Sequence, residues 1–206
     1  MKIKQTITEQ FQTNCYLVYD ETGKEAVLID PGERVPVLED FIEQEGLKVK
    51  KILLTHGHLD HILAAEYYKE KYEAKIGAHH LEKEVLEDPL VNLTERTGRP
   101  LSLVCDEYYE EGDRVEPFGF EVIDTPGHTC GSCSYMLKDW LFTGDALFHN
   151  SVGRWDLPTG NLAQLMETLG KLLHPDMEKI VYPGHGQSTD TSYERITNPF
   201  SADRIQ

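Results

Sequence analysis

Seven consecutive residues constrain this chain more than any other segment: positions 55–61 read Thr-His-Gly-His-Leu-Asp-His. Three imidazoles and a carboxylate so close together are too polar for a core, and a solvated surface more often uses Lys and Glu. A short apolar run at 51–54 lies directly upstream and predicts a buried strand. We therefore interpret the segment as a metal site at a strand end rather than as a polar turn. His56 and His58 can chelate one ion while Asp60 and His61 reach toward a second.

If two metals bind, these four groups cannot complete both coordination shells, so other segments must supply ligands. Three segments share one pattern, in which a short hydrophobic run is followed by Gly and then by one His or Asp. Glycine beside a ligand lets the backbone adopt positive φ and approach an ion closely. One such turn is weak evidence, because Gly-His and Gly-Asp turns are common. Four strand-end sites in series are a strong signal, and the three further candidates are His128, Asp145 and His185.

The order of H-x-H-x-D-H, a lone His, a lone Asp and a final His resembles the metallo-β-lactamase superfamily, and in particular its hydroxyacylglutathione hydrolase (glyoxalase II) branch. The resemblance covers nearly the whole chain, and segments 141–148, 153–158, 193–195 and 198–200 resemble a short, single-domain subgroup. By position, it implies one metal on His56, His58 and His128, a second on Asp60, His61 and His185, and Asp145 as the bridge.

The chain pattern predicts an α/β domain. We expect strands at 3–7, 15–19, 26–29, 51–54, 74–77, within 107–146 and at 179–182, and helices at 35–44, 59–72, 80–87 and 162–173. Residues 90–106 have no clear period and predict a loop. Strands and helices recur in both halves without a linker or repeat, so residues 1–206 are expected to form one domain. The resemblance implies the same arrangement, an αββα sandwich of two mixed sheets face to face with helices outside.

Composition narrows the function. The chain has 206 residues, of which 36 are acidic and 20 basic, for a formal charge of −16. Nucleic-acid binding needs clustered basic residues, so we expect no nucleic-acid partner. No apolar segment is long enough to span a bilayer, which predicts no membrane association. Four cysteines are too few for a disulfide scaffold of this length, so we expect a cytoplasmic protein. The sequence gives no indication of the oligomeric state.

The predicted site favours hydrolysis of a small-molecule thioester or another ester. Two divalent ions lower the pKa of a shared water from near 16 to roughly 7, and the resulting hydroxide attacks a polarised carbonyl. A thiolate leaving group, with a thiol pKa of about 8.5, needs no general acid. We expect two Zn²⁺ ions per chain, although imidazole ligands also suit iron or manganese. Asp60 and Asp145 are the predicted catalytic carboxylates, and they act by binding the metal ions.

Arg154 and Asp156 are expected to form a partly buried ion pair that orders the loop. If the loop faces the pocket, Arg154 is the candidate for binding a substrate carboxylate, because its guanidinium can form a bidentate pair. His149 is a possible pocket residue. The Cys130-Gly131-Ser132-Cys133 segment is interpreted as a structural turn rather than a redox pair. Adjacent residues in a strand point to opposite faces, so the pair at 79–80 is interpreted as structural or solvent-facing.

Four other functions compete with this one. A persulfide dioxygenase-like oxidoreductase would use one iron on His56, His128 and Asp145. An RNA-processing nuclease is disfavoured by the acidic charge, and a non-catalytic domain would not need all seven ligands. The resemblance disfavours a true β-lactamase because those enzymes generally lack the bridging Asp. The chain also ends soon after His185, without the helical region by which the full-length enzymes bind glutathione, so we expect weak saturation by glutathione thioesters.

Overall fold

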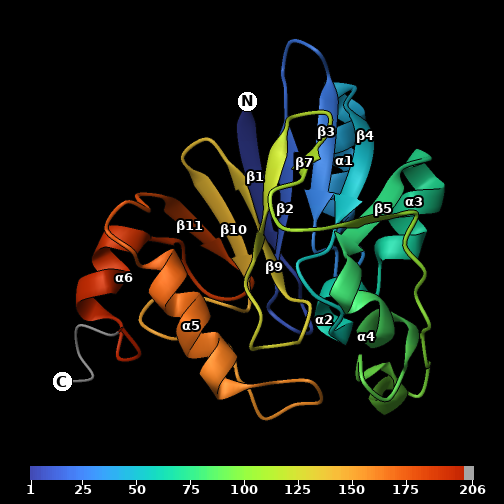
Figure 1. Ribbon diagram of the computed structural model, residues 1–206. Coiled ribbons are helices and arrows are strands. Elements are labelled where there is room, and N and C mark those ends of the chain that lie inside the picture. The colour runs from blue at the N-terminus through green and yellow to red at the C-terminus, as the bar shows by residue number, and fades with distance from the viewer. Residues whose placement is uncertain (202–206) are drawn as a thin grey trace.

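The protein forms a sandwich of two facing sheets with helices on the outer sides, in the computed structural model that describes residues 1–201 (Figure 1). The first half of the chain makes the sheet β1-β2-β3-β4-β5-β6, and the second half makes β12-β11-β10-β9-β8-β7. Both sheets are mixed: β1 to β3 and β7 to β10 pair antiparallel, whereas β3 to β6, and β10 with β11, pair parallel. This confirms the predicted αββα fold.

The strands are β1 (Lys2–Ile7), β2 (Asn14–Tyr19), β3 (Glu25–Ile29), β4 (Lys48–Leu53), β5 (Lys75–His79), β6 (Glu107–Tyr109), β7 (Arg114–Val115), β8 (Phe120–Asp124), β9 (Cys133–Leu137), β10 (Trp140–Gly144), β11 (Ile180–Pro183) and β12 (Thr189–Asp190). The α-helices are α1 (Pro36–Glu45), α2 (Leu59–Ile62), α3 (Ala65–Tyr72), α4 (Lys83–Glu87), α5 (Leu162–Leu172) and α6 (Thr191–Thr197), and the 3₁₀ turns are η1 (His80–Glu82) and η2 (Thr94–Thr97). Among the described residues no helix is both long and apolar enough to cross a bilayer.

Three hydrophobic layers hold the sandwich together. Every residue of β2 is buried, because both faces of its sheet are covered. Tyr16 and Val18 belong to the cluster between the two sheets, whereas Leu17 joins the cluster that includes Leu38 of α1 and Tyr68 of α3. A third cluster packs α5 onto the outer face of the second sheet. The packing fixes the sheets relative to each other and therefore fixes the strand ends that carry the candidate ligands.

The prediction of one helix over 59–72 is wrong in its middle, where the chain leaves the helix between Ile62 and Ala65. The backbone N–H of Ala64 donates to the carbonyl of Pro31, 3.0 Å away, instead of continuing the helix. The short α2 that results carries Asp60 and His61. Strand β12 and helix α6 were not predicted, and η2 lies within the segment predicted as a loop.

Candidate metal centre

The seven predicted ligands converge at one end of the sandwich. They follow strands β4, β8, β10 and β11, and three overlapping groups of them have nitrogen or oxygen atoms within 4.8 Å of one another. Strands from both sheets contribute, so the site exists only because the two sheets face each other. The groups are His56, His58 and His128; His56, His61 and Asp145; and Asp60, His61 and His185.

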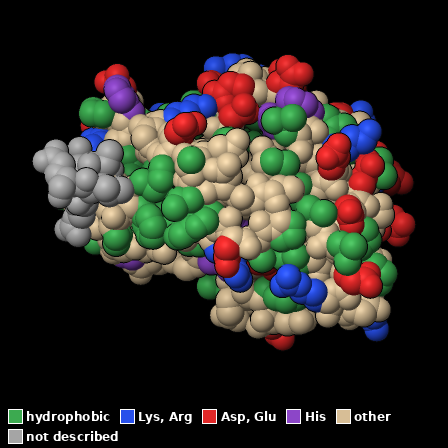
Figure 2. All heavy atoms as spheres, turned by 60° about the horizontal axis from the view of Figure 1, so that its bottom comes forward, with side chains coloured by type: hydrophobic (Ala, Val, Ile, Leu, Met, Phe, Trp, Pro, Cys, Tyr) green, Lys and Arg blue, Asp and Glu red, His purple; other side chains and the backbone are tan. Residues whose placement is uncertain are grey.

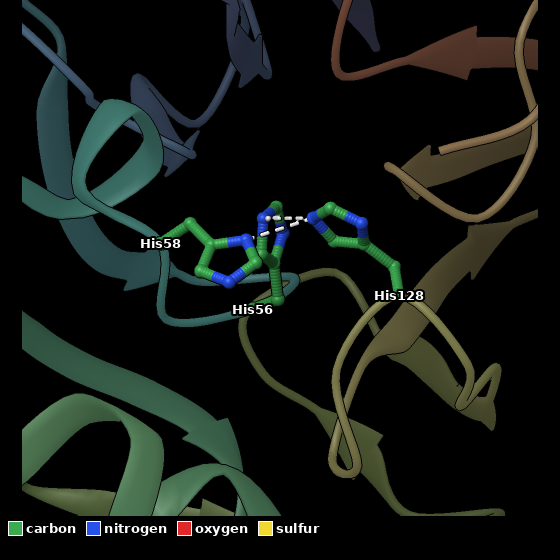
Figure 3. A group of neighbouring side chains, drawn as sticks. All are labelled: His56, His58 and His128. Atoms are coloured by element: carbon green, nitrogen blue, oxygen red, sulfur yellow. Dashed lines mark hydrogen bonds between the residues drawn. The ribbon is translucent and has the colours of Figure 1, made fainter. Parts of the chain in front are cut away.

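The first set consists of three buried histidines whose rings point at one another from two loops (Figure 3). Nε2 of His128 lies 2.8 Å from Nδ1 of His58 and 3.2 Å from Nε2 of His56. A neutral imidazole has one unprotonated nitrogen, and three such nitrogens facing one point have too few protons to satisfy them all. A cation at that point would accept all three lone pairs, so the donor set fits a metal.

The second set consists of Asp60, His61 and His185. Oδ2 of Asp60 lies 3.0 Å from Nε2 of His185 and 3.6 Å from Nε2 of His61. The Asp60 side chain is 22% exposed and that of His185 is 29% exposed, whereas His61 is fully buried. The second set therefore forms the open edge of the centre, where a substrate can approach.

Asp145 lies between the two sets. Its Oδ2 is 3.6 Å from Nε2 of His128, and its Oδ1 is 3.4 Å from Nε2 of His61 and 3.8 Å from Nε2 of His185. Oδ1 of Asp145 and Nε2 of His61 are both buried without a hydrogen-bond partner among the described residues. Buried polar atoms are rarely left unpaired, and two cations on either side of this carboxylate would satisfy them.

Electrostatics distinguish the two sets. Burial and the neighbouring imidazoles hold the pKa of His56 well below its ordinary value and lower the pKa of His58 to about 3. Burial also opposes protonation of His61, but the nearby carboxylates outweigh it and raise the His61 pKa well above its ordinary value. His56 and His58 are thus neutral and ready to bind a metal, whereas a metal in the second set must displace a proton from His61.

Asp30 supports both sets, although the sequence analysis did not single it out. Its carboxylate accepts hydrogen bonds from Thr55 N at 2.8 Å and Thr55 Oγ1 at 2.7 Å, and lies 3.0 Å from Nδ1 of His61. The last contact turns Nε2 of His61 toward the centre, as carboxylates commonly do for metal-binding histidines. The signal was present, because Asp30 directly follows β3 just as the other site residues follow their strands.

Glu82 was also missed. This fully buried carboxylate accepts hydrogen bonds from Gly57 N at 2.8 Å, Thr129 Oγ1 at 2.9 Å and Gly131 N at 3.0 Å. Burial raises the pKa of Glu82 to about 7, although the three donors oppose the shift. Because Gly57 separates His56 from His58 and Thr129 follows His128, one side chain ties together the two loops of the first set. No local sequence pattern marks Glu82.

Two glycines have the role that the sequence analysis expected of them. Gly144 precedes Asp145 with φ of +49°, a conformation that favours glycine. Gly184 precedes His185 and allows close approach, because a Cβ there would collide with Oδ1 of Asp145 and Cε1 of His61. These positions let the second set close around its ligand atoms.

Arg154 acts here through its backbone. Its carbonyl oxygen lies 2.6 Å from Nδ1 of His128, which directs Nε2 of that ring toward the centre. Its guanidinium forms a bidentate pair with Asp156, at 2.7 and 2.9 Å. That pair is exposed, at 60% and 64% of the two side chains, so the expectation of a partly buried pair is wrong. Thr55 Oγ1 lies 3.2 Å from Nδ1 of His56, whereas Thr143 bonds the Leu147 carbonyl instead of a ligand.

The remaining candidates lie outside the seven-residue cluster. His79 is buried with Nε2 3.0 Å from Asp124, and Nδ1 of His80 lies 3.2 Å from the Tyr109 carbonyl, in agreement with structural roles. His149 lines a cavity of about 350 Å³ together with the predicted ligand His185. This cavity therefore adjoins the open edge of the centre.

Comparisons with known proteins identify the family. The profile described as "Metallo-beta-lactamase superfamily" matches residues 8–185. The chain belongs to this superfamily. It is 36% identical to the hydroxyacylglutathione hydrolase GloC of Haemophilus influenzae over 198 residues, which cover 92% of this chain and 93% of GloC.

Solved structures agree with this assignment. The structure of BLEG-1 B3 metallo-beta-lactamase superimposes with a TM-score of 0.89 at 37% identity and covers 98% of this chain and 100% of that one. TTHA1623 in a di-iron-bound form superimposes with a TM-score of 0.84 at 36% identity, covering 96% of this chain and 99% of that one. ETHE1 from Myxococcus xanthus superimposes with a TM-score of 0.80 at 32% identity, covering 97% of this chain and 84% of that one. The family and the His/Asp cluster support a metal-dependent hydrolase.

Proposed function

We propose that this protein is a dinuclear metal-dependent hydrolase of small-molecule thioesters. The position of Asp145 carries the proposal, because its two oxygens face different ligand sets. One set is built from His56, His58 and His128, and the other from Asp60, His61 and His185. The second set therefore supplies ligands for a second ion next to the first.

The chemistry follows from this arrangement. Two ions bound here would supply a hydroxide at neutral pH and polarise the substrate carbonyl. The buried Asp145 fixes the separation between the two sets, and Asp30 and Glu82 hold the rings and loops in place. Asp60 and His185 lie at the open edge, so the scissile carbonyl approaches from their side. A thiolate leaves without help from a general acid, which agrees with a site built only from metal ligands and their supports.

We infer zinc as the metal, because a site rich in imidazole with two carboxylates suits Zn²⁺. Iron is the alternative, and the similarity to TTHA1623 in a di-iron-bound form supports it. The similarity to GloC supports a hydroxyacylglutathione-like thioester as substrate. The four cysteines form no disulfide, which agrees with the cytoplasmic location that we also infer.

The test is a hydrolysis assay on protein that carries two zinc ions per chain. Wild-type protein should release thiol from S-lactoylglutathione, and Asp145→Asn, which keeps the shape but removes the bridging charge, should lose this activity. The similarity to BLEG-1 makes a chromogenic cephalosporin a necessary second substrate. No turnover of any thioester by fully loaded protein, with or without β-lactam hydrolysis, would overturn the thioester assignment.

A persulfide dioxygenase-like activity is the second candidate, and the similarity to ETHE1 from Myxococcus xanthus at 32% identity is the reason to test it. It would use one iron on His56, His128 and Asp145. Oxygen uptake by iron-loaded protein with a glutathione persulfide distinguishes it from hydrolysis, which consumes no oxygen. Activity that depends on oxygen and on one metal per chain would favour this candidate.

A further inference from the structure

A groove beside the metal centre has features of a ligand site. It is lined by Gln10, Phe11, Leu59, Leu63, Arg96, Thr97, Arg99, Pro100 and Leu101, and has a volume of about 1060 Å³. Small-molecule sites typically measure about 300–1,000 Å³ and combine apolar walls with a few polar groups. This groove is therefore large enough for a molecule of tripeptide size.

Both walls of the groove are tied to the second ligand set. On one wall, the neighbours of Phe11 reach the ligands: the Gln12 carbonyl lies 3.2 Å from Nδ1 of His185, and Thr13 Oγ1 lies 3.3 Å from Oδ2 of Asp60. On the other wall, Leu59 directly precedes Asp60 on α2. The groove is therefore lined by immediate chain neighbours of residues that contact or belong to the second set.

The segment that carries the two arginines is held firmly at its base. Buried Asn92 donates to the carbonyls of Leu86 and Leu101, and Thr94 Oγ1 accepts from Leu101 N at 2.8 Å. The Asn92 carbonyl in turn accepts from Leu59 N at 2.9 Å, which fastens the segment to α2. These contacts anchor the segment that carries Arg96 and Arg99 beside the helix that bears Asp60 and His61.

The guanidinium groups of Arg96 and Arg99 have no recorded partner in residues 1–201. The other arginines of this part of the chain are all bonded: Arg34, Arg114 and Arg154 pair with acids, and Arg195 donates to carbonyls. The chain has 36 acidic residues, and Figure 2 shows acidic side chains gathered along the upper and right-hand edges of one face. Two arginines left without acidic partners on so acidic a protein mark a place for an external anion.

We propose that this groove binds the anionic end of the thioester substrate, with Arg96 and Arg99 on its carboxylate or phosphate oxygens. The half-buried side chains of Phe11, Leu59 and Leu63 cover the apolar part next to the centre. The inference rests on the proposed function. It assigns specificity for charged thioesters to the segment at 92–101.

Substrates of different charge test the proposal. The double variant Arg96→Gln, Arg99→Gln is compared with wild type and with Arg114→Gln, a control that removes one arginine at β7, away from the groove. The probes are S-lactoylglutathione for carboxylates, a coenzyme A thioester for phosphates, and an acyl N-acetylcysteamine thioester, which is neutral. The ratio of kcat/KM for the anionic over the neutral thioester should fall about tenfold or more in the double variant, because hydrogen bonds from a guanidinium to an anion are lost. KM should carry the change, with kcat nearly constant.

The anionic probe whose kcat/KM falls more in the double variant shows whether the groove prefers a carboxylate or a phosphate. An unchanged ratio for both anionic probes, or an equal loss in the Arg114→Gln control, would refute the proposal. Calorimetric titration of zinc-loaded protein with S-methylglutathione and with coenzyme A separates the groove from the reaction. If wild type binds a probe, the double variant binds it more weakly, and wild type hydrolyses no thioester, the groove proposal stands and the proposed function is refuted. No binding of either probe to wild type would refute the groove.

Discussion

Replacing Glu82 with alanine should damage the first ligand set more than any other single change outside the ligands themselves. The substitution leaves Gly57 N, Thr129 Oγ1 and Gly131 N without their acceptor. The threonine hydroxyl has an alternative partner in Ser132 Oγ, 2.6 Å away, but the two backbone N–H groups have none recorded. Each buried unpaired group costs about 1–3 kcal/mol, so the expected loss in the free energy of unfolding is about 2–6 kcal/mol.

The same change should weaken metal binding by the first set. Outer contacts that orient metal ligands typically affect metal affinity by about 10–100-fold, and Glu82 holds both loops of this set. Cobalt substitution separates this effect from general destabilisation, because each cobalt ion reports its own coordination in the visible spectrum. In Glu82→Ala we expect the cobalt ion in the first ligand set to bind more weakly, and the cobalt ion in the second set to be less affected. Glu82→Gln, which keeps the shape and at least one acceptor, should fall between the alanine variant and wild type.

Chemical unfolding of metal-free protein and cobalt titration together check this reasoning. The matched control is Glu84→Ala, an exposed glutamate two residues along on α4 that should change neither measurement. If Glu82→Ala unfolded at the same denaturant concentration as wild type and bound both cobalt ions with the same affinity, the role assigned to this carboxylate would be refuted.

Two further predictions test the approach of the loops and the role of the thiols. Gly184→Ala should displace Asp145 and reduce the zinc content measured by elemental analysis. Gly170→Ala, at a helical position with open space, should keep both metals and unfold at a slightly higher temperature. Equal metal content in the two variants would contradict the packing argument. Because burial raises the thiol pKa of both Cys130 and Cys133, the double serine variant should keep most hydrolase activity; loss of activity at unchanged metal content would restore a redox role for the pair.

The fold and the ligand cluster were predictable because their signals are local in sequence. Alternating and continuous apolar runs mark the strands, and each ligand follows a strand end, so the positions of His56, His128 and Asp145 emerge from pattern alone. The break after Ile62 was not predictable, because it depends on a hydrogen bond from Ala64 to the distant Pro31 carbonyl. Tertiary contacts of this kind do not change the periodicity of apolar residues in the sequence.

The supports of the site divide in the same way. Asp30 follows a strand as the ligands do, so the pattern contained it. Glu82 accepts hydrogen bonds from two loops 25 and 47–49 positions away, and a glutamate at a helix start is ordinarily solvated. The environment of Arg154 was equally hidden, since its carbonyl, not its side chain, contacts His128. Residues that act through the fold are found only once the fold is known.

The central claim is that two separate ligand sets share Asp145, and metal stoichiometry tests it most directly. Metal-free protein titrated with Zn²⁺ in the presence of a competing chelator should bind two ions per chain. His58→Ala, which disrupts only the first set, and His185→Ala, which disrupts only the second, should each bind one ion tightly. Saturation of the wild type at one ion, or loss of both ions in each single variant, would contradict the dinuclear centre.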